Sequence, residues 1–401
     1  MVSKTTNSFL FVLIMVGLIS AFGPFVTDFY LPALPALSGY FNTTASMVQL
    51  SLTFSMIGLG VGQLFIGPMS DKYGRKSMLM LSLVLFIVST VGCIFSPGIS
   101  SFLFFRLLQG LTGAGGVVIS KSIATDLYEG ESLTRFFSML SAVQGLAPIC
   151  APVLGGLLLE VTDWRGIFAI LLLVAVLLIV MLCFFRESLP VGRRNTGRLS
   201  AVFKVYGAVL KNREFMLYVL VQSFAMGLMF TYIAASPFVF QQHYGLSSLV
   251  YSFCFGLNAL AIMGGSFFVI RFKTVKKGLS VGCIAFFALS IATAGVLVAD
   301  MGVIWVEAAL LLLLFFLGMI LPTSTTLALQ LERDNSGSAS AVLGFLTFLF
   351  GGVFSPLAGL GNMIVSTSVI MVLCGACTLV LNRCVPYTAV GAGQPDSSVA
   401  V

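Results

Sequence analysis

The chain has 401 residues, of which 58% are hydrophobic and only 9% are charged, and its formal net charge is +7. A soluble protein of this length carries roughly 25% charged residues, so the composition excludes a water-soluble globular protein. Apolar stretches of about 20 residues, enough to span a bilayer, follow one another almost from end to end. The sequence therefore predicts a polytopic helical membrane protein.

Charged residues, glycines and prolines divide the chain into twelve apolar segments. Their expected bounds are 8–32, 44–69, 77–96, 100–125, 135–160, 164–185, 214–240, 247–271, 278–299, 302–330, 337–361 and 364–384. The first segment is too long for a signal peptide and has no small-residue cleavage site, so we expect it to stay in the mature protein. A basic connector, 186–213, separates an N-terminal six-helix bundle (1–185) from a C-terminal one (214–384). The polar tail, 385–401, is expected to be disordered.

The basic residues concentrate in loops on one side of these segments. Lys72, Arg75 and Lys76 follow the second segment, and Lys276 and Lys277 follow the eighth. Loops rich in Lys and Arg stay in the cytoplasm, so both termini are expected to be cytoplasmic. This asymmetry accounts for the net charge without a nucleic-acid partner.

The metal-binding residue types give little signal. The eight cysteines lie in or beside apolar segments and are interpreted as small apolar fillers, with a disulfide or metal role as the alternative. His243, the single histidine, falls in an outer loop. We expect no metal site and no cofactor.

The two halves repeat at an offset of about 200–206 residues. Pro152 in the fifth segment corresponds to Pro356 in the eleventh, and the basic loop at 70–77 corresponds to the one at 271–277. Two sets of six helices in parallel repeat resemble the architecture of major facilitator transporters, whose halves rock about a central site.

The loop "GPMSDKYGRKS", Gly67 to Ser77, resembles the loop signature of that superfamily. Gly67 would permit close helix approach, Gly74 would supply a turn, and Asp71 would pair with a cation or face a helix N-terminus. With Arg75, Lys76 and Asp126, these residues are expected to act in conformational gating. The alternative is a turn that only sets the membrane orientation.

Two further motifs resemble those of proton-linked facilitators. "RLLQGLTGAG" begins at Arg106, a buried arginine that precedes small residues. "VQGLAPICAPVLGG" resembles the antiporter signature, and it is compatible with a kinked packing helix. Its small residues would allow tight helix packing, and its prolines would free backbone carbonyls. The antiporter residues are Gly145, Pro148, Pro152, Gly155 and Gly156.

Several stretches together resemble the Bcr/CflA branch of bacterial drug:proton antiporters. They are "TDFYLPALPAL", "GPMSDKYGRK", "APVLGG", "DWRGIF", "FRESLP" and "ASPFVF". The resemblance implies a protein of the bacterial inner membrane. The chain departs from the branch at Thr125-Asp126, where an Arg-Asp pair is common, and at Lys121, which stands in place of an arginine. The charge distribution at that helix end therefore does not carry over.

An aspartate inside the first segment is the candidate for proton coupling. Asp28 lies about four residues from the outer end, roughly 6 Å into the membrane, and Arg106 is expected at nearly the same depth. Burial disfavours an ionised carboxylate and a nearby arginine favours it, so helix movement could change its protonation. We hypothesise that Asp28 binds the proton and that Arg106 sets its affinity. The alternative is that Asp28 only anchors the outer end near the headgroups.

The sequence indicates the substrate site less clearly than the proton site. The chain has 37 Phe and 17 Met residues, and an aromatic, Met-lined cavity suits flat apolar or weakly cationic compounds. Tyr30, Gln144 and Tyr232 are the candidate substrate-binding residues. Glu307, beside Trp305 at a helix start, is interpreted as an interfacial group, with a second intramembrane acid as the alternative.

These features predict a proton-driven multidrug efflux antiporter that works by alternating access, functions as a monomer and exports small apolar or cationic compounds. A proton-coupled metabolite or amino-acid exporter, a passive facilitator and a channel are the alternatives, and sodium could replace protons. An enzyme is not expected, because the sequence has no HExxH, GxSxG or P-loop motif.

Overall fold

The computed structural model describes residues 7–128, 130–194, 199–332 and 335–385. The helices of the N-terminal half are α1 (Phe9–Asp28), α2 (Leu34–Tyr40), α3 (Ala45–Tyr73), α4 (Arg75–Ile94), α5 (Ile99–Leu127), α6 (Gly130–Leu159) and α7 (Trp164–Phe184). After α8 (Leu199–Lys211) come α9 (Arg213–Pro237), α10 (Ser248–Phe268), α11 (Val275–Val298), α12 (Val303–Leu331), α13 (Ser336–Leu357) and α14 (Met363–Cys384). Short helical turns occupy η1 (Leu31–Ala33), η2 (Val191–Arg193), η3 (Phe238–His243) and η4 (Val269–Arg271).

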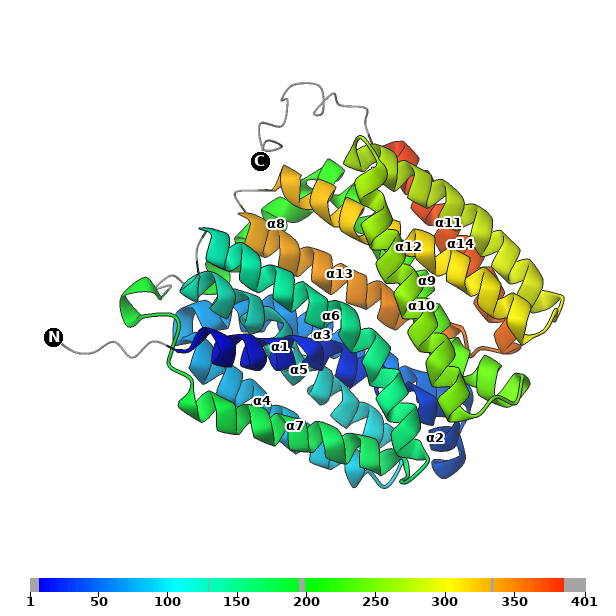
Figure 1. Ribbon diagram of the computed structural model, residues 1–401, viewed down its shortest axis with the longest axis horizontal. Coiled ribbons are helices and arrows are strands. Elements are labelled where there is room, and N and C mark those ends of the chain that lie inside the picture. Colours follow the sequence, from blue (N-terminus) through cyan, green and yellow to red (C-terminus); the bar gives the residue numbers. More distant parts are fainter. Residues whose placement is uncertain (1–6, 129, 195–198, 333–334, 386–401) are drawn as a thin grey trace.

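The helices run side by side between two ends of the molecule (Figure 1). We call the end that carries α8 the connector end and the end that carries α2 the α2 end. Within the described residues, eleven helices are long and apolar enough to cross a membrane. The one predicted segment not among these eleven is 135–160. It corresponds to the thirty-residue helix α6, whose part Leu146–Leu159 is apolar. The expected all-α membrane fold is confirmed.

Polar residues define where many helices begin, because hydrocarbon offers no partner for free backbone groups. The side chains of Thr44, Asn212, Ser247 and Thr274 each accept a hydrogen bond from a backbone N–H in the first turn of the following helix. Large apolar side chains cover the outside instead, as on α7, where Leu173 is 63% exposed.

The first predicted segment, 8–32, is not one continuous helix. α1 ends at Asp28, and after Tyr30 the chain continues through η1 and then α2 to Tyr40. Pro32 and Pro35 lie in the first turns of these two elements, where the lack of an N–H matters least. The break places residues 29–40 against α9, α10 and η3 of the other half.

The helix pairs repeat between the two halves. α3 packs on α5 as α10 packs on α12, α4 on α7 as α11 on α14, and α1 on α6 as α9 on α13. The halves meet through two equivalent pairs, α3 with α13 and α6 with α10, which we call the seam. The parallel pseudo-repeat expected from the sequence is therefore confirmed.

The connector contains one helix that the sequence interpretation did not predict. α8 packs against α13, α9 and α3, so it lies across the connector end and contacts both halves. Tyr206 of α8 donates a hydrogen bond to the carbonyl oxygen of Leu64 in α3 at 3.1 Å. Residues 386–401 of the expected tail lie outside the described residues.

Two loops at the α2 end are joined through Asp300. Tyr244 donates to Asp300 Oδ1 at 2.9 Å, and His243 Nε2 lies 3.1 Å from the same atom. These two hydrogen bonds hold the pKa of the exposed Asp300 carboxyl below its usual range. His243 therefore links the end of η3 to the loop between α11 and α12.

We expect Gly110→Ala to destabilise the protein, because α3 and α5 cross closely at this residue. A Cβ built there would lie 1.9 Å from the carbonyl oxygen of Ser55, and overpacking of this kind costs about 1–3 kcal/mol. Gly113→Ala is the matched control, because its Cβ would meet only side chains at 3.8 Å. Thermal unfolding in detergent should show a lower Tm for Gly110→Ala alone. Equal midpoints for the two variants would contradict the close crossing.

Candidate transport site and gating network

The seam is closed by hydrogen bonds between the halves at the α2 end. Thr53 and Ser355 join α3 to α13 through their hydroxyls at 3.0 Å. Gln49 donates to the carbonyl oxygen of Ala234 at 2.9 Å, and Gln241 donates to that of Pro32 at 3.2 Å. Three helices, α3, α9 and α13, and the turns η1 and η3 are thus held together at this end.

At the connector end a cavity of about 590 Å³ lies between the halves. Residues of α3, α5, α8 and α13 line it, and many of them are polar: Gln63, Asp71, Lys121, Ser122, Thr125, Tyr206, Ser338 and Ser340. Its volume falls within the range of small-molecule binding sites, which is about 300–1,000 Å³. The cavity is thus open at the connector end, whereas the hydrogen bonds described above close the seam at the α2 end.

Two charged residues reach this cavity from the N-terminal half. Lys121 lies on α5 near the connector end, as expected from its distance along the helix from Arg106. Asp71 lies on α3, and its carboxylate, together with burial, raises the pKa of the Tyr206 hydroxyl. A solute in the cavity would therefore meet charges of both signs.

Arg106 is fully buried between α1, α5 and α7. It donates to the carbonyl oxygen of Val26 at 3.0 Å and also to Gln109. Its guanidinium lies 4.2 Å from the centre of the Tyr30 ring, an arrangement that favours a cation. The Tyr30 hydroxyl is held by Ser51 at 2.9 Å. Arg106 and Tyr30 thus form one packed unit inside the N-terminal half.

Asp28 is buried at the end of α1 but does not pair with Arg106. Within the described part of the chain, no ion pair involves Asp28, and Arg106 contacts the α1 backbone instead. The Asp28 carboxyl lies within electrostatic range of the Tyr251 hydroxyl on α10, across the seam. Among the described residues Arg106 thus makes no ion pair with Asp28, and its effect on the proton affinity of Asp28 stays a prediction.

Tyr232 and Glu307 come together in the C-terminal half. Asn258 of α10 donates to the Tyr232 hydroxyl at 3.0 Å and to Glu307 Oε2 at 3.1 Å. Glu307 is half-buried and accepts a hydrogen bond from a residue inside the bundle, which favours the alternative interpretation as a second intramembrane acid. No sequence pattern indicates that Glu307 pairs with Asn258, because the two residues lie on different helices. Trp305, by contrast, is exposed.

The small residues of α6 allow close packing within the N-terminal half and across the seam. A Cβ at Gly155 would lie 2.0 Å from the Phe29 carbonyl oxygen, and one at Gly156 would lie 2.3 Å from Ser252 Oγ on α10. Pro148 and Pro152 lie inside the same helix. Gln144 and Gly145 also belong to α6, but their surroundings lie outside the described part of the structure.

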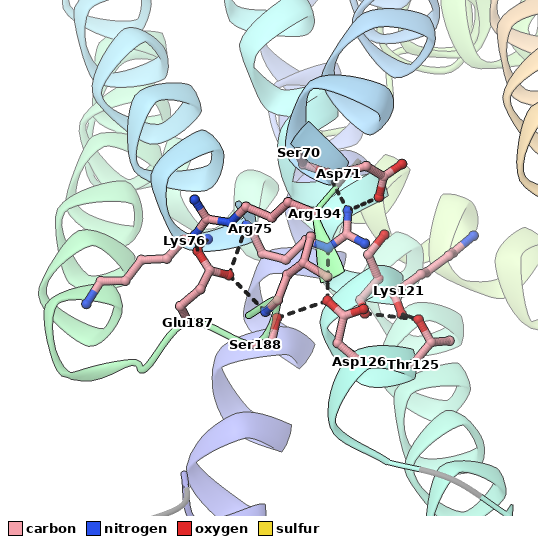
Figure 2. A network of polar contacts seen from close by, with 12 residues as sticks. Ser70, Asp71, Arg75, Lys76, Lys121, Thr125, Asp126, Glu187, Ser188 and Arg194 are labelled. Atoms are coloured by element: carbon pink, nitrogen blue, oxygen red, sulfur yellow. Dashed lines mark hydrogen bonds and ion pairs between the residues drawn. The ribbon is translucent and has the colours of Figure 1, made fainter. Parts of the chain in front are cut away.

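The loop between α3 and α4 centres on one buried arginine (Figure 2). Arg75 Nε donates to Asp126 Oδ2 at 2.9 Å, and its Nη1 donates to Asp71 and to Ser70. Ser188 donates to the same Asp126 oxygen at 3.1 Å. We call these residues, with Lys76, Glu187 and Arg194, the Arg75 network.

Glu187 is the member of this network that the sequence interpretation missed. Its carboxylate accepts from the backbone N–H groups of Arg75 and Lys76 at 3.0 and 3.2 Å, which caps the start of α4. Arg194 lies 3.6 Å from it. The stretch "FRESLP" carries this acid directly after the sixth span, but no local pattern indicates that it folds back onto α4.

Glycines make this arrangement possible. Gly74 has φ +99°, a region that favours glycine, and a Cβ there would lie 2.5 Å from Glu187 Oε2. A Cβ at Gly67 would lie 3.2 Å from Val118 of α5. Lys76 Nζ donates to the carbonyl oxygens of Cys183 and Phe185 at the end of α7. The network thus joins α3, α4, α5 and the chain after α7, all within the N-terminal half and the connector.

We expect Asp126→Asn to destabilise the protein, because it leaves the buried Arg75 with weaker acceptors. Hydrogen bonds to charged groups contribute about 1.5–3 kcal/mol each. Thr125→Ala is the control, since the exposed Thr125 hydroxyl bonds only to its own helix backbone. Thermal unfolding of the purified protein checks this, and an Asp126→Asn midpoint equal to that of Thr125→Ala would rule out the contribution.

Comparisons with known proteins agree with this architecture. The sequence profile of the Major Facilitator Superfamily matches residues 11–382. The MFS-type transporter YdgK of Bacillus subtilis is 37% identical over 87% of this chain and 88% of its own length. A bicyclomycin resistance protein homolog of Haemophilus influenzae is 26% identical over 94% of this chain and 96% of its own.

A solved structure has the same fold at low sequence identity. The xylose transporter XylE of E. coli, in a partially occluded inward open conformation, superposes with a TM-score of 0.71, 14% identity and coverage of 96% of this chain and 99% of its own. The second relative's name agrees with the resemblance to the Bcr/CflA branch. The chain is therefore not an enzyme but a multi-pass membrane transporter that belongs to the Major Facilitator Superfamily.

Proposed function

We propose that this transporter is a proton-driven antiporter that exports small apolar or cationic compounds from bacterial cells. The observation that carries the proposal is the position of Asp28. The Asp28 carboxyl group is buried, lies within electrostatic range of Tyr251 of the other half and has no cation partner among the described residues. Membrane acids that face a bundle interior are costly to bury and typically serve transport.

The seam supplies a way to change the surroundings of Asp28. Residues 29–40 and α6 pack against the C-terminal half at the α2 end, so a rocking motion of the halves would alter what contacts the carboxyl. Exposure to opposite sides in turn would let Asp28 take up a proton from one side and release it to the other. Arg106 holds the backbone at Val26, and we assign it a positioning role for α1.

The charge asymmetry supports a cytoplasmic location of the connector end. The Arg75 network, the connector and the loop after α10 bring most Lys and Arg residues to that end. The chain would then reside in the inner membrane with both termini inside, and the cavity would be open to the cytoplasm. This is the conformation in which an exporter collects its substrate.

The substrate class is the least constrained part of the proposal. The name of the bicyclomycin resistance protein homolog favours a drug or similar small compound. The gating role of the Arg75 network and the substrate-binding role of Tyr30, Gln144 and Tyr232 stay predictions. A metabolite exporter of the same fold is the second candidate, because the polar cavity lining would also suit hydrophilic solutes.

We expect Asp28→Asn to abolish proton release driven by substrate in everted membrane vesicles, because the asparagine amide does not bind a proton near neutral pH. The protein should still fold, since the change conserves shape. Glu160→Gln is the matched control: this acid is exposed at the same end of the molecule, so its loss should leave transport unchanged. The measurement is quenching of a pH-sensitive dye across a panel of ethidium, tetraphenylphosphonium and chloramphenicol.

The same vesicles separate the alternatives. Full proton release by Asp28→Asn would refute the assignment of the proton site. Uptake insensitive to a protonophore would indicate a passive facilitator, and dependence on a sodium gradient would indicate a different coupling ion. A growth defect under metabolite overload, with unaltered drug tolerance, would favour the metabolite exporter.

We expect a cysteine at Ser122, in the cavity, to react with a membrane-impermeant maleimide in everted vesicles. A cysteine at Thr53, in the hydrogen-bonded part of the seam, should react little. Labelling above the background of the native cysteines measures the difference. Preferential labelling of Ser122→Cys in right-side-out vesicles instead would invert the proposed orientation.

A further inference from the structure

The second intramembrane acid belongs to a three-residue cluster in the C-terminal half. Tyr232 of α9, Asn258 of α10 and Glu307 of α12 form what we call the Tyr232 cluster. One amide group, Asn258 Nδ2, donates to both neighbours, at 3.0 Å to the tyrosine and 3.1 Å to the carboxylate. Three helices therefore meet through one polar group that is 1% exposed.

Two acceptor oxygens in this cluster have no donor. Neither Asn258 Oδ1 nor Glu307 Oε1 has a hydrogen-bond partner among the described residues, although both atoms are inaccessible to solvent. Leaving a buried polar group unsatisfied costs about 1–3 kcal/mol, and more for a charged group. Both unsatisfied atoms lack the same thing, a donor. The cluster is thus incomplete in a way that an added hydrogen-bond donor would correct, and a proton on the carboxyl group is one such donor.

A small cavity lies on the Tyr232 side of the cluster and favours a small ligand. This cavity of about 20 Å³, beside Tyr232, Ser236 and Thr367, can hold about one water molecule but no organic cation. The Thr367 hydroxyl, which lines it, also has no partner and would bind such a water. We propose that Glu307 is a second proton-binding site of this transporter, held in position by Asn258.

The groups that face Glu307 leave its charge uncompensated. Tyr232 comes from α9, and Tyr251 and Cys254 come from α10, and all three are within electrostatic range of the carboxyl. α10 and the described part of α13 carry no charged residue, and those of α9 and α11 lie in the first turn at the connector end. Among the described residues, no cation therefore competes with a proton for this carboxylate.

Tyr251 connects this site to the one assigned in the other half. Its hydroxyl is within electrostatic range of both Asp28 and Glu307, and it is hydrogen-bonded to Ser236 at 3.1 Å. The two acids thus lie on opposite sides of the seam, with Tyr251 within electrostatic range of each. The inference rests on the proposed proton coupling and deepens it: two acids, one on each side of the seam, carry protons in one transport cycle.

The test counts protons. Purified protein in proteoliposomes is given whichever of ethidium, tetraphenylphosphonium and chloramphenicol the wild type transports, and proton and substrate fluxes are measured together. Glu307→Gln should move one proton fewer per substrate molecule than the wild type. Glu307→Asp, which keeps the acid, should restore the wild-type ratio, and Glu160→Gln should match it. Size-exclusion profiles of each variant establish that it is folded.

The outcomes separate this inference from the proposed function. A Glu307→Gln ratio equal to that of the wild type would overturn the second site while leaving the role of Asp28 intact. If Glu307→Gln at fixed pH instead lost a sodium ion per substrate molecule that the wild type moves, the site would bind a metal cation and not a proton. A wild type that moves no protons would overturn the proposed function and the role of Glu307 with it.

Discussion

Hydrocarbon offers no hydrogen-bond partner, and this constraint determines where each polar group of the chain lies. Arg106 is fully buried and bonded to a backbone carbonyl and to Gln109, while Leu173 and similar side chains cover the outside. The same constraint makes the exceptions informative. The few buried acceptors that stay unsatisfied, such as Glu307 Oε1 and Asn258 Oδ1, are places where the fold alone does not account for the residue present.

Close packing of helices is the second requirement, and it explains the abundance of glycine. In a membrane the driving force between helices comes from direct contact and not from the exclusion of water, so small residues at crossings are needed. Gly110 against Ser55 and Gly155 against Phe29 serve this need inside the N-terminal half, and Gly156 against Ser252 serves it at the seam. The same kind of residue thus builds the rigid halves and the surface between them.

The fold could be predicted from the sequence because its signals are local. Apolar length, basic loops and the offset of about 200 residues define twelve helices and two halves without knowledge of any contact. The candidate sites were less predictable, because their partners come from distant segments. Among the described residues Asp28 makes no ion pair with Arg106 but lies within electrostatic range of Tyr251, and Glu307 accepts a hydrogen bond from Asn258. These contacts depend on which faces α10 and α12 turn toward their neighbours. Similarly, Glu187 reaches the start of α4 only because the chain folds back after α7.

The position of α8 has a mechanical consequence. This helix packs on α13 and α9 of one half, while its Tyr206 is bonded to Leu64 of the other. It therefore crosses the open end of the cavity and is attached to both halves. If the two halves approach each other at this end, either the space under α8 must shrink or the hydrogen bond between Tyr206 and Leu64 must break. In the proposed alternating-access cycle, the amplitude of the movement would accordingly be limited by the connector, a segment outside both bundles.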